Sequence, residues 1–314
     1  MSVKPSIAIS HPVADLPLMS EVRDYWRLLK PNVMSLVVFS AGVGLYLAPG
    51  NLHPVIAMIA ILCIAVGAGA SAAINNSYDA DIDRVMARTR KRPTALGVIN
   101  PADALAFGVT LSIISITVMG LAVNWAAASL LALTIGFYVI VYTLWLKRRT
   151  PQNIVIGGAA GALPPMVGWA AVTGDIGLMP LVLFAIIFFW TPPHFWALAL
   201  YRAQDYATAG VPMLPVTAGA AVTRRHILIY TLILLPISLL PLSLGAAGLP
   251  YGLFATALGV GFIGHAVRLW RDGTQRSATK TFRFSILYLF GVFGALVLDD
   301  MIEQILLALS GSLG

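Results

Sequence analysis

Nine apolar stretches, each close to the length that crosses a lipid bilayer, dominate the sequence. A helix needs about 20 residues, at 1.5 Å per residue, to span the hydrocarbon core. Of the 314 residues, 59% are apolar and only 11% are charged, whereas soluble domains are about one-quarter charged. The pattern predicts an all-α, polytopic membrane protein with nine transmembrane helices. Their approximate bounds are 32–49, 54–77, 102–122, 125–146, 153–173, 178–200, 226–246, 250–268 and 283–309.

The cations predict how these helices are oriented. If the N-terminus lies in the cytoplasm, all 20 Lys and Arg residues fall in cytoplasmic segments. The other side is then left with Asp175, Asp299, Asp300 and Glu303. Because cytoplasmic loops are enriched in Lys and Arg, we predict a cytoplasmic N-terminus and a C-terminus on the opposite face. The net charge of +7 then needs no nucleic acid to explain it.

The segment before the first apolar stretch is predicted to be a cytoplasmic arm. We divide the chain into this arm, residues 1–31, and a transmembrane domain, residues 32–314. Within the arm, "RDYWRLLKP" (23–31) combines aromatic residues with three cations, Arg23, Arg27 and Lys30, that fall on one side of a helix. Such a segment suits the membrane interface, although a plain solvated lead-in would look the same.

Two of the apolar stretches contain residues that disrupt a membrane helix. Pro192 and Pro193 lie in the sixth stretch, where they predict a kink or a break, because proline cannot complete the helical hydrogen-bond ladder. In the ninth stretch, three acidic residues follow Leu298. We therefore expect the last span to stop near Leu298 and an amphipathic tail to follow it.

The most polar segment, "NNSYDADIDRVMARTRKRP", begins at the end of the second stretch. If the helix continues, Asn75, Asp79 and Asp83 share one face because they are four residues apart, and Asn76 lies beside Asp79. Their oxygens suit Mg²⁺, which typically takes one or two carboxylates and completes its shell with phosphates and water. The alternative is a solvated helix end whose aspartates pair with nearby arginines.

Other charged residues surround these aspartates. Asp81 points away from the shared face, so we predict a structural role for it. The run "RTRKRP" (88–93) is either a topology signal alone or a set of donors for diphosphate or carboxylate groups, which arginine binds in bidentate fashion.

This segment resembles the first Asn- and Asp-rich motif of the UbiA superfamily of intramembrane prenyltransferases. Its form looks like that of the haem-modifying branch, the protoheme IX farnesyltransferases or haem O synthases. Two further stretches agree with this branch, "YTLWLKRRTPQNIVIGGAAGALPPMVGW" (142–169) and "WTPPHFWALALYRAQDYATAGVPMLPV" (190–216). The resemblance covers about residues 25–300 and implies a UbiA-type helical bundle around a central cavity.

The resemblance also implies roles for individual residues. Asp205 matches the second acidic motif, but Tyr201 and Ala209 stand where a second aspartate would complete it, so a symmetric two-metal clamp is not expected. The implied Mg²⁺ ligands are Asn75, Asn76, Asp79, Asp83 and Asp205. The implied binding residues for diphosphate or propionate are Arg84, Arg88, Arg92, Lys147, Arg148 and Arg202. The implied catalytic residues are Asp79, Asp83, His194 and Asp205.

His194 follows the double proline at membrane depth, where a polar group is costly and often functional. Three roles compete: a ligand to haem iron, a base or proton carrier, or a structural hydrogen bond. The small residues of "GGAAGALPP" (157–165) allow either neighbouring helices or a flat ring to approach closely. The segment "DYATAGVPMLPV" (205–216) is typical of an ordered loop that caps the cavity.

The implied activity is farnesyl transfer from farnesyl diphosphate to a vinyl group of haem b. Mg²⁺ and the cations would stabilise the leaving diphosphate, the vinyl group would attack the allylic cation, and water would then add. The implied setting is a bacterial inner membrane with the site facing the cytoplasm and the C-terminus in the periplasm. Membrane lipid, and a haem A synthase or other oxidase assembly factors, are the implied partners.

Two other functions fit parts of the sequence. The chain could prenylate a quinone precursor or another aromatic acceptor, although "TPPHFW" argues against this. It could instead be an ion-coupled transporter or a non-catalytic haem-handling protein. A transporter would place its acids near the middle of the bilayer, whereas here they lie at one end of a helix.

Overall fold

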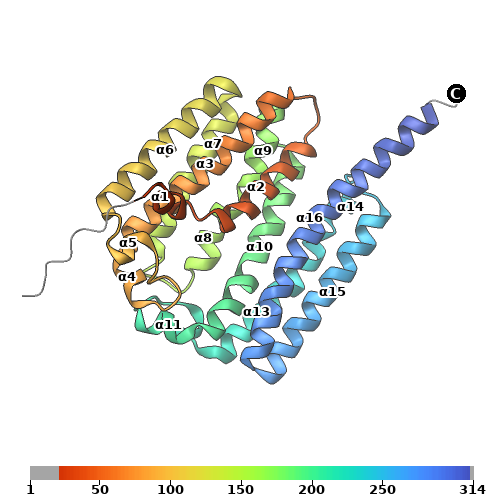
Figure 1. The fold of residues 1–314 in the computed structure, drawn as a ribbon. Coiled ribbons are helices and arrows are strands. Elements are labelled where there is room, and N and C mark those ends of the chain that lie inside the picture. The colour runs from red at the N-terminus through yellow and green to blue at the C-terminus, as the bar shows by residue number, and fades with distance from the viewer. Residues whose placement is uncertain (1–20, 312–314) are drawn as a thin grey trace, which may run out of the picture.

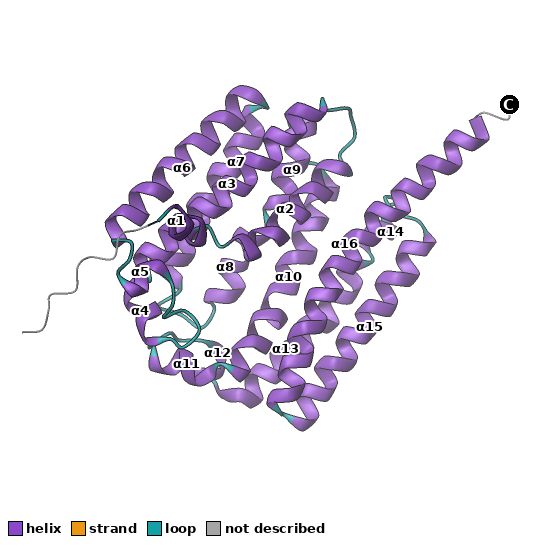
Figure 2. Cartoon of the chain, in the orientation of Figure 1, coloured by secondary structure: helices purple, strands orange, loops and turns teal. Residues whose placement is uncertain are grey.

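The computed structural model describes residues 21–311 as a bundle of helices (Figure 1). Residues 1–20 and 312–314 lie outside the described residues, so most of the predicted arm is not tested. Every regular element between residues 21 and 311 is helical (Figure 2), which confirms the all-α prediction. The long elements are α2 (Pro31–Tyr46), α3 (Pro54–Tyr78), α6 (Pro101–Ala122), α7 (Trp125–Gly136), α8 (Asn153–Ala162), α9 (Pro164–Thr173), α10 (Leu178–Tyr201), α13 (Gly219–Ser238), α15 (Leu249–Asp272) and α16 (Gln275–Gly311).

Short helices occupy the connections. They are α1 (Val22–Leu28), α4 (Ala80–Val85), α5 (Pro93–Leu96), α11 (Ala203–Thr208), α12 (Leu214–Thr217) and α14 (Leu240–Ser243). Within residues 21–311, 8 helical segments are long and apolar enough to cross a membrane, and a ninth qualifies if α1 and α2, bent by 53°, are taken together. The chain is therefore a multi-pass membrane protein, as predicted.

Successive spans run in opposite directions, with α8 and α9 together forming one span, so the connections gather at two ends of the bundle (Figure 1). We call the end formed by connections 79–100, 147–152, 202–218 and 273–274 the motif end. Every Lys and Arg residue of the described chain lies in these connections, in the segment before α2, or in adjoining helix turns. The structure thus brings the cations to the end that carries the polar segment.

Small residues allow the helices to approach closely. A Cβ on Gly44 of α2 would collide with the backbone oxygen of Pro165, and one on Gly168 of α9 would collide with that of Ala41. In α8, Gly157 lies against the Tyr142 ring and Gly158 against Thr191. Close helix packing therefore accounts for much of the small-residue segment. Gly161 differs, since a Cβ added to it would meet nothing within 4 Å.

The double proline does not break the sixth span. Helix α10 runs without interruption from Leu178 to Tyr201, with Pro192 and Pro193 inside it. Of the predicted kink or break, the break is therefore excluded, and the kink stays a prediction. Helix α10 packs against α8, α13 and α16, and these contacts stabilise it where the two prolines lack N–H donors. The chain breaks instead at the other double proline, where α8 ends at Ala162 and Pro164 begins α9.

The last helix does not end near Leu298. Helix α16 continues to Gly311, and its final turns extend away from the bundle (Figure 1). Asp299 is buried, with its carboxylate accepting hydrogen bonds from the backbone N–H groups of Gly248 (2.5 Å) and Tyr251 (3.2 Å) at the start of α15. The acid that seemed to end the span therefore caps a neighbouring helix, where the positive end of its dipole favours a carboxylate.

Candidate active site

The aspartates of the polar segment lie at the junction of α3 and α4. Helix α3 ends at Tyr78, and only Asp79 interrupts the helical path before α4 begins at Ala80. Backbone hydrogen bonds continue through the junction, from Asp79 N to Asn75 O (3.0 Å) and from Asp83 N to Asp79 O (2.8 Å). The side chains are not solvated, because Asn75, Asp79 and Asp83 are only 3%, 0% and 2% exposed.

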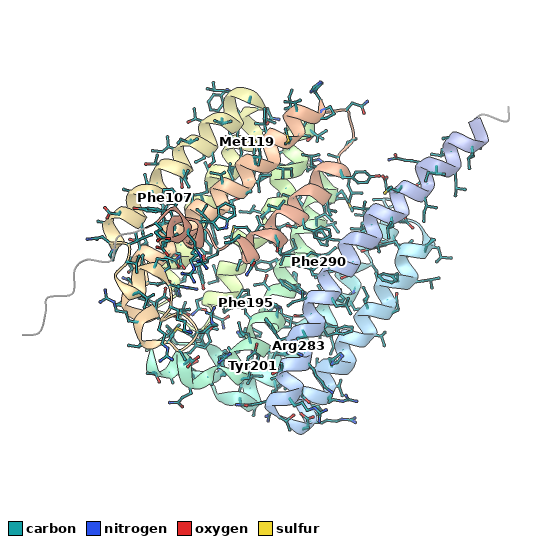
Figure 3. The ribbon with its side chains drawn as sticks, in the orientation of Figure 1. Phe107, Met119, Phe195, Tyr201, Arg283 and Phe290 are labelled. Atoms are coloured by element: carbon teal, nitrogen blue, oxygen red, sulfur yellow. The ribbon has the colours of Figure 1, made fainter. Side chains whose placement is uncertain are left out.

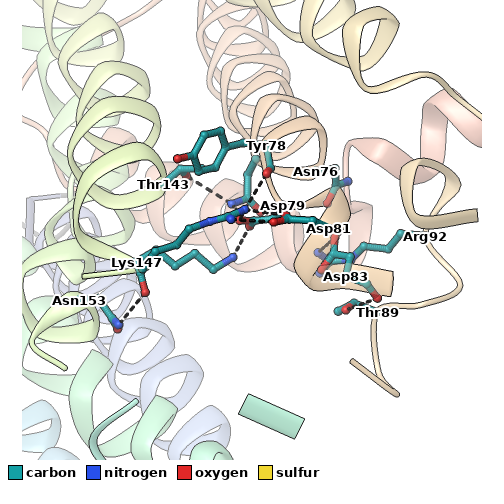
Figure 4. Close-up of polar contacts among 12 residues, drawn as sticks. Asn76, Tyr78, Asp79, Asp81, Asp83, Thr89, Arg92, Thr143, Lys147 and Asn153 are labelled. Carbon is teal, nitrogen blue, oxygen red and sulfur yellow. Dashed lines mark hydrogen bonds and ion pairs between the residues drawn. The ribbon is translucent and has the colours of Figure 1, made fainter. Parts of the chain in front are cut away.

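Three aspartates, spaced two residues apart, form ion pairs with three cations (Figure 4). Asp79 pairs with Lys147 and lies 3.7 Å from Arg148. Asp81 accepts two hydrogen bonds from Arg148, at 2.7 and 2.8 Å. Asp83 accepts one from Arg92, at 2.7 Å.

The alternative prediction was therefore right about pairing and wrong about solvation. The aspartates lie in connection 79–100, and Lys147 and Arg148 lie in connection 147–152, so these ion pairs link two connections at the motif end. Outside the spans, the hydrogen bonds from Arg148 hold the pKa of Asp81 below its usual range, and the same contact raises the pKa of Arg148. This supports the structural role predicted for Asp81, which positions the guanidinium.

Lys147 reaches Asp79 through an unusual stretch of helix. Residues Phe137–Leu146 form a π-helix that continues α7. In it the N–H of Lys147 donates to the carbonyl of Tyr142, five residues earlier, at 2.9 Å. The Thr143 hydroxyl accepts a hydrogen bond from Asn75 Nδ2 at 3.3 Å (Figure 4). Segments of π-helix recur at functional sites, and this one brings a hydroxyl and an ammonium group to the same asparagine–aspartate pair.

Lys30 joins the site although it was expected to face the membrane surface with Arg23 and Arg27. Helix α1 ends at Leu28, and Lys30 adopts a left-handed backbone, with φ of 52°. This backbone turns its side chain inward, where Nζ donates to Asn75 Oδ1 at 2.9 Å. Burial lowers the pKa of Lys30 well below its usual range, and the nearby cations Arg92 and Lys147 lower it further. The predicted surface position of Lys30 is therefore wrong.

The oxygen atoms at this junction fit a divalent cation only in part. Asp79 Oδ1 and Asn76 Oδ1 are buried and accept no hydrogen bond, so both could serve as ligands. Asp79 Oδ2 is occupied by Asn75 and Lys147, and Asp83 by Arg92. Within residues 21–311, no group of three or more His, Cys, Asp or Glu side chains is placed to hold a metal. Carboxylate and amide oxygens of this kind match the one or two protein ligands that Mg²⁺ requires when phosphates complete its shell.

The second acidic segment lies at the same end of the bundle. Asp205 lies in α11, and its Oδ2 is 3.9 Å from Arg202 and accepts no hydrogen bond. Val211 and Met213, which follow α11, pack in one apolar cluster with Ile82 and Met86 of the first segment. The two acidic segments are thus held together by apolar packing, in keeping with the predicted order of residues 205–216.

Two predicted anion-binding residues have no acidic partner. In the described part of the chain, no carboxylate pairs with Arg84 or Arg88, and both side chains are exposed at the motif end. Both guanidinium groups are therefore available to an anion at this end of the bundle.

His194 lies in α10, away from the acidic residues. It is 9% exposed and its ring is stacked against Trp190, with centroids 4.3 Å apart. Its Nδ1 lies 2.6 Å from Ser285 Oγ of α16. The predicted polar residue at membrane depth is therefore present and hydrogen-bonded.

Comparison with known proteins places this arrangement in a family. A model of the UbiA prenyltransferase family matches residues 36–290. A protein from Sinorhizobium fredii named protoheme IX farnesyltransferase is 58% identical over 302 residues, covering 94% of this chain and 95% of that protein. One of the same name from Azorhizobium caulinodans is 60% identical over 285 residues, covering 90% and 93%.

Solved structures show the same fold at low sequence identity. A digeranylgeranylglyceryl phosphate synthase matches with a TM-score of 0.74 and 18% identity, covering 88% of this chain and 98% of that one. A UbiA homologue from Archaeoglobus fulgidus, bound to GPP and Mg²⁺, matches with a TM-score of 0.61 and 18% identity, covering 87% and 99%.

Proposed function

The chain belongs to the UbiA prenyltransferase family, and from this membership we propose that it transfers a farnesyl group from farnesyl diphosphate to a vinyl group of haem b, with addition of water, to form haem O. The observation that carries the proposal is the identity of 58% with the Sinorhizobium fredii relative, which extends over nearly the whole of both chains. The buried aspartates and their cations supply the chemistry that such a transfer needs at the diphosphate.

We assign the binding of Mg²⁺ to the oxygens at the α3–α4 junction. Asp79 Oδ1 and Asn76 Oδ1 accept no hydrogen bond, although Arg148 lies 3.7 Å from Asp79 Oδ1 and would have to share it with the metal. Asp83, Asn75 and Asp205 are the further candidates at the motif end. Mg²⁺ bound with the diphosphate would neutralise part of its negative charge and polarise the bridging oxygen. The GPP and Mg²⁺ in the Archaeoglobus fulgidus structure support this assignment.

The leaving diphosphate is assigned to the cations around these oxygens. As the C–O bond of farnesyl diphosphate breaks, negative charge grows on the departing oxygen, and fixed cations lower the barrier. Lys30, Lys147 and Arg92 already lie beside the aspartates. Arg84, Arg88, Arg148 and Arg202 lie at the same end and complete the set.

The acceptor step takes place in the apolar interior. The vinyl π electrons of haem b attack the farnesyl cation, which forms a C–C bond and leaves a cation next to the porphyrin. Water captures that cation and releases one proton, which leaves a hydroxyethylfarnesyl substituent. The farnesyl tail lies in the central cavity expected between the helices, where exclusion of bulk water protects the first cation.

The site faces the cytoplasm in this proposal. The protein lies in a bacterial inner membrane with the motif end in the cytoplasm, because the motif end holds every cation of the described chain and cytoplasmic loops are enriched in cations. The C-terminus, at the other end of α16, is then periplasmic.

One incubation tests the proposed activity. Purified full-length protein is mixed with haem b, farnesyl diphosphate and Mg²⁺, and the haem products are analysed by mass spectrometry. We expect a product heavier by one farnesyl group and one hydroxyl group, together with one pyrophosphate per product, and neither in EDTA. A parallel incubation with a hydroxybenzoate or naphthoate acceptor must give no product. Prenylation of the aromatic acid, with haem left unchanged, would refute the assignment of the acceptor.

A further inference from the structure

His194 and Ser285 form a buried polar pair between two helices. They are 91 residues apart in sequence, and Nδ1 of the histidine lies 2.6 Å from Oγ of the serine. Aromatic rings fix the imidazole on both sides. Trp190 stacks at 4.3 Å with a 22° interplanar angle, and Phe282 lies at 4.6 Å with a 31° angle. The imidazole therefore has a single orientation.

The hydrogen bonds of Ser285 determine where the imidazole carries its proton. Ser285 Oγ lies 2.6 Å from the carbonyl oxygen of Phe282 and donates its proton there, because a carbonyl cannot donate. The hydroxyl has no second proton, so both contacts are hydrogen bonds only when Nδ1 of His194 is the donor to Ser285 Oγ, and we assign the tautomer on that basis. Neutral His194 is thus protonated at Nδ1, and Nε2 carries the free lone pair.

Nε2, the other ring nitrogen of His194, is not fully buried. Within residues 21–311, no group forms a hydrogen bond with it, and it is not among the buried polar atoms that lack a partner. The His194 side chain is 9% exposed, and the next residue of α10, Phe195, which is labelled in Figure 3, is 37% exposed. The lone pair of Nε2 is therefore available to a ligand that enters between the helices.

We propose that Nε2 of His194 binds the iron of the haem acceptor, and that Ser285 is a positioning residue that fixes the tautomer for this bond. The inference rests on the proposed function, which supplies haem as the substrate. Histidine ligands of metals usually donate their second ring N–H to an oxygen acceptor, which fixes the tautomer and raises the basicity of the ligand. Ser285 Oγ supplies that acceptor here.

The surroundings favour a metal ligand over a proton carrier. A proton carrier needs a partner that takes up the proton, and no carboxylate of the described chain pairs with His194. Its one polar partner, Ser285, has its own proton engaged with Phe282. The rings of Trp190 and Phe282 also prevent the rotation by which an imidazole passes on a proton. Bound through its iron, the porphyrin would have one fixed distance and tilt relative to α10, which presents its vinyl groups in a defined position.

Spectroscopy of haem on the full-length protein tests the bond directly. Ferrous haem b is added to wild type and to His194→Gly, and the iron–histidine stretch is recorded by resonance Raman scattering. We expect the band in wild type, its loss in the variant, and its return when imidazole is added to the variant. Return of the band also shows that the variant is folded. Metal-free protoporphyrin IX, which has no iron to bind, should bind both proteins within about twofold of one another.

Serine variants test the positioning role. Ser285→Ala should shift the stretching band to lower frequency and weaken haem affinity about tenfold, and Ser285→Thr, which keeps the hydroxyl, should restore both. Ser238→Ala is the matched control, because Ser238 is also fully buried but contacts Tyr288 instead of His194. Its band should equal that of wild type.

Each result separates this inference from the proposed function. An iron–histidine band that persists in His194→Gly would overturn iron ligation, even if haem O is formed. A band in Ser285→Ala identical to that of wild type would overturn the positioning role. Failure of wild type to bind any haem would instead overturn the acceptor in the proposed function, and the inference with it.

Discussion

Replacement of Asp79 by asparagine gives the sharpest test of the α3–α4 junction. The side chain is fully buried, and its carboxylate accepts from Asn75 and pairs with Lys147. Asparagine has nearly the same shape and keeps one oxygen, so Asp79→Asn removes the charge and leaves the packing in place. The variant therefore asks what the negative charge contributes.

The contacts of Asp79 determine how much stability and how much turnover Asp79→Asn should lose. Breaking a buried ion pair costs about 3–5 kcal/mol of stability, but Lys147 is 17% exposed and the amide oxygen still accepts, so we expect a loss of about 1–3 kcal/mol. Total stability of about 5–15 kcal/mol leaves such a variant folded. In the proposed function the Asp79 carboxylate holds the Mg²⁺ that stabilises the leaving diphosphate, and loss of such a fixed charge costs at least about hundredfold in turnover.

Asp81→Asn is the matched control, because it makes the same chemical change two residues away. Asp81 is 65% exposed at its side chain and pairs only with Arg148. An exposed pair contributes about 0–1 kcal/mol, so stability should change little. Turnover should fall only by the effect of a less well positioned Arg148, far less than in Asp79→Asn.

The assay combines two measurements on detergent-purified protein, the midpoint of thermal unfolding and the rate of haem O formation by mass spectrometry. Asp79→Asn should unfold a few degrees earlier and lose nearly all turnover. Near-normal turnover in Asp79→Asn, or an equal loss in Asp81→Asn, would refute the idea that the buried face carries the chemistry.

Three further outcomes follow from other contacts. Lys30→Met should raise the KM for farnesyl diphosphate about tenfold with a smaller change in kcat, measured by steady-state kinetics; an unchanged KM would remove Lys30 from the diphosphate site. Gly44→Ala should lower stability by about 1–3 kcal/mol, because its Cβ would strike Pro165, whereas Gly42→Ala meets nothing within 4 Å; equal unfolding midpoints would contradict this. Asp299→Ala should cost about 0.5–2 kcal/mol and leave turnover unchanged, and Glu303→Ala, which is exposed, is its control.

Local spacing made the core of the site predictable. The apolar stretches were long enough to identify the spans, and residues four apart on a helix had to share a face, so Asn75 and Asp79 could be placed together before the structure was known. Lys147 and Arg148 were predictable from the resemblance and lie beside Asp79.

Features that depend on distant contacts were not predictable. The position of Lys30 is set by a left-handed backbone and by a partner 45 residues away. The one available signal was its place immediately before Pro31, since a residue before proline is restricted in conformation. Asp299 looked like the end of a span because its partners, the N–H groups of α15, lie about 50 residues earlier. The helix also does not break at Pro192, where packing against neighbouring helices outweighs the local preference of proline.

The three aspartate–cation pairs also bear on how a reaction cycle ends. The carboxylates of the chain already pair with Lys147 and Arg92. If these cations bind the diphosphate as proposed, the arriving diphosphate must displace the carboxylates from them. The free energy that the diphosphate gains from the cations is partly offset by the cost of breaking these aspartate–cation pairs. When pyrophosphate leaves, the carboxylates pair with the cations again. The carboxylates therefore compete with pyrophosphate for the cations, which favours release of the product.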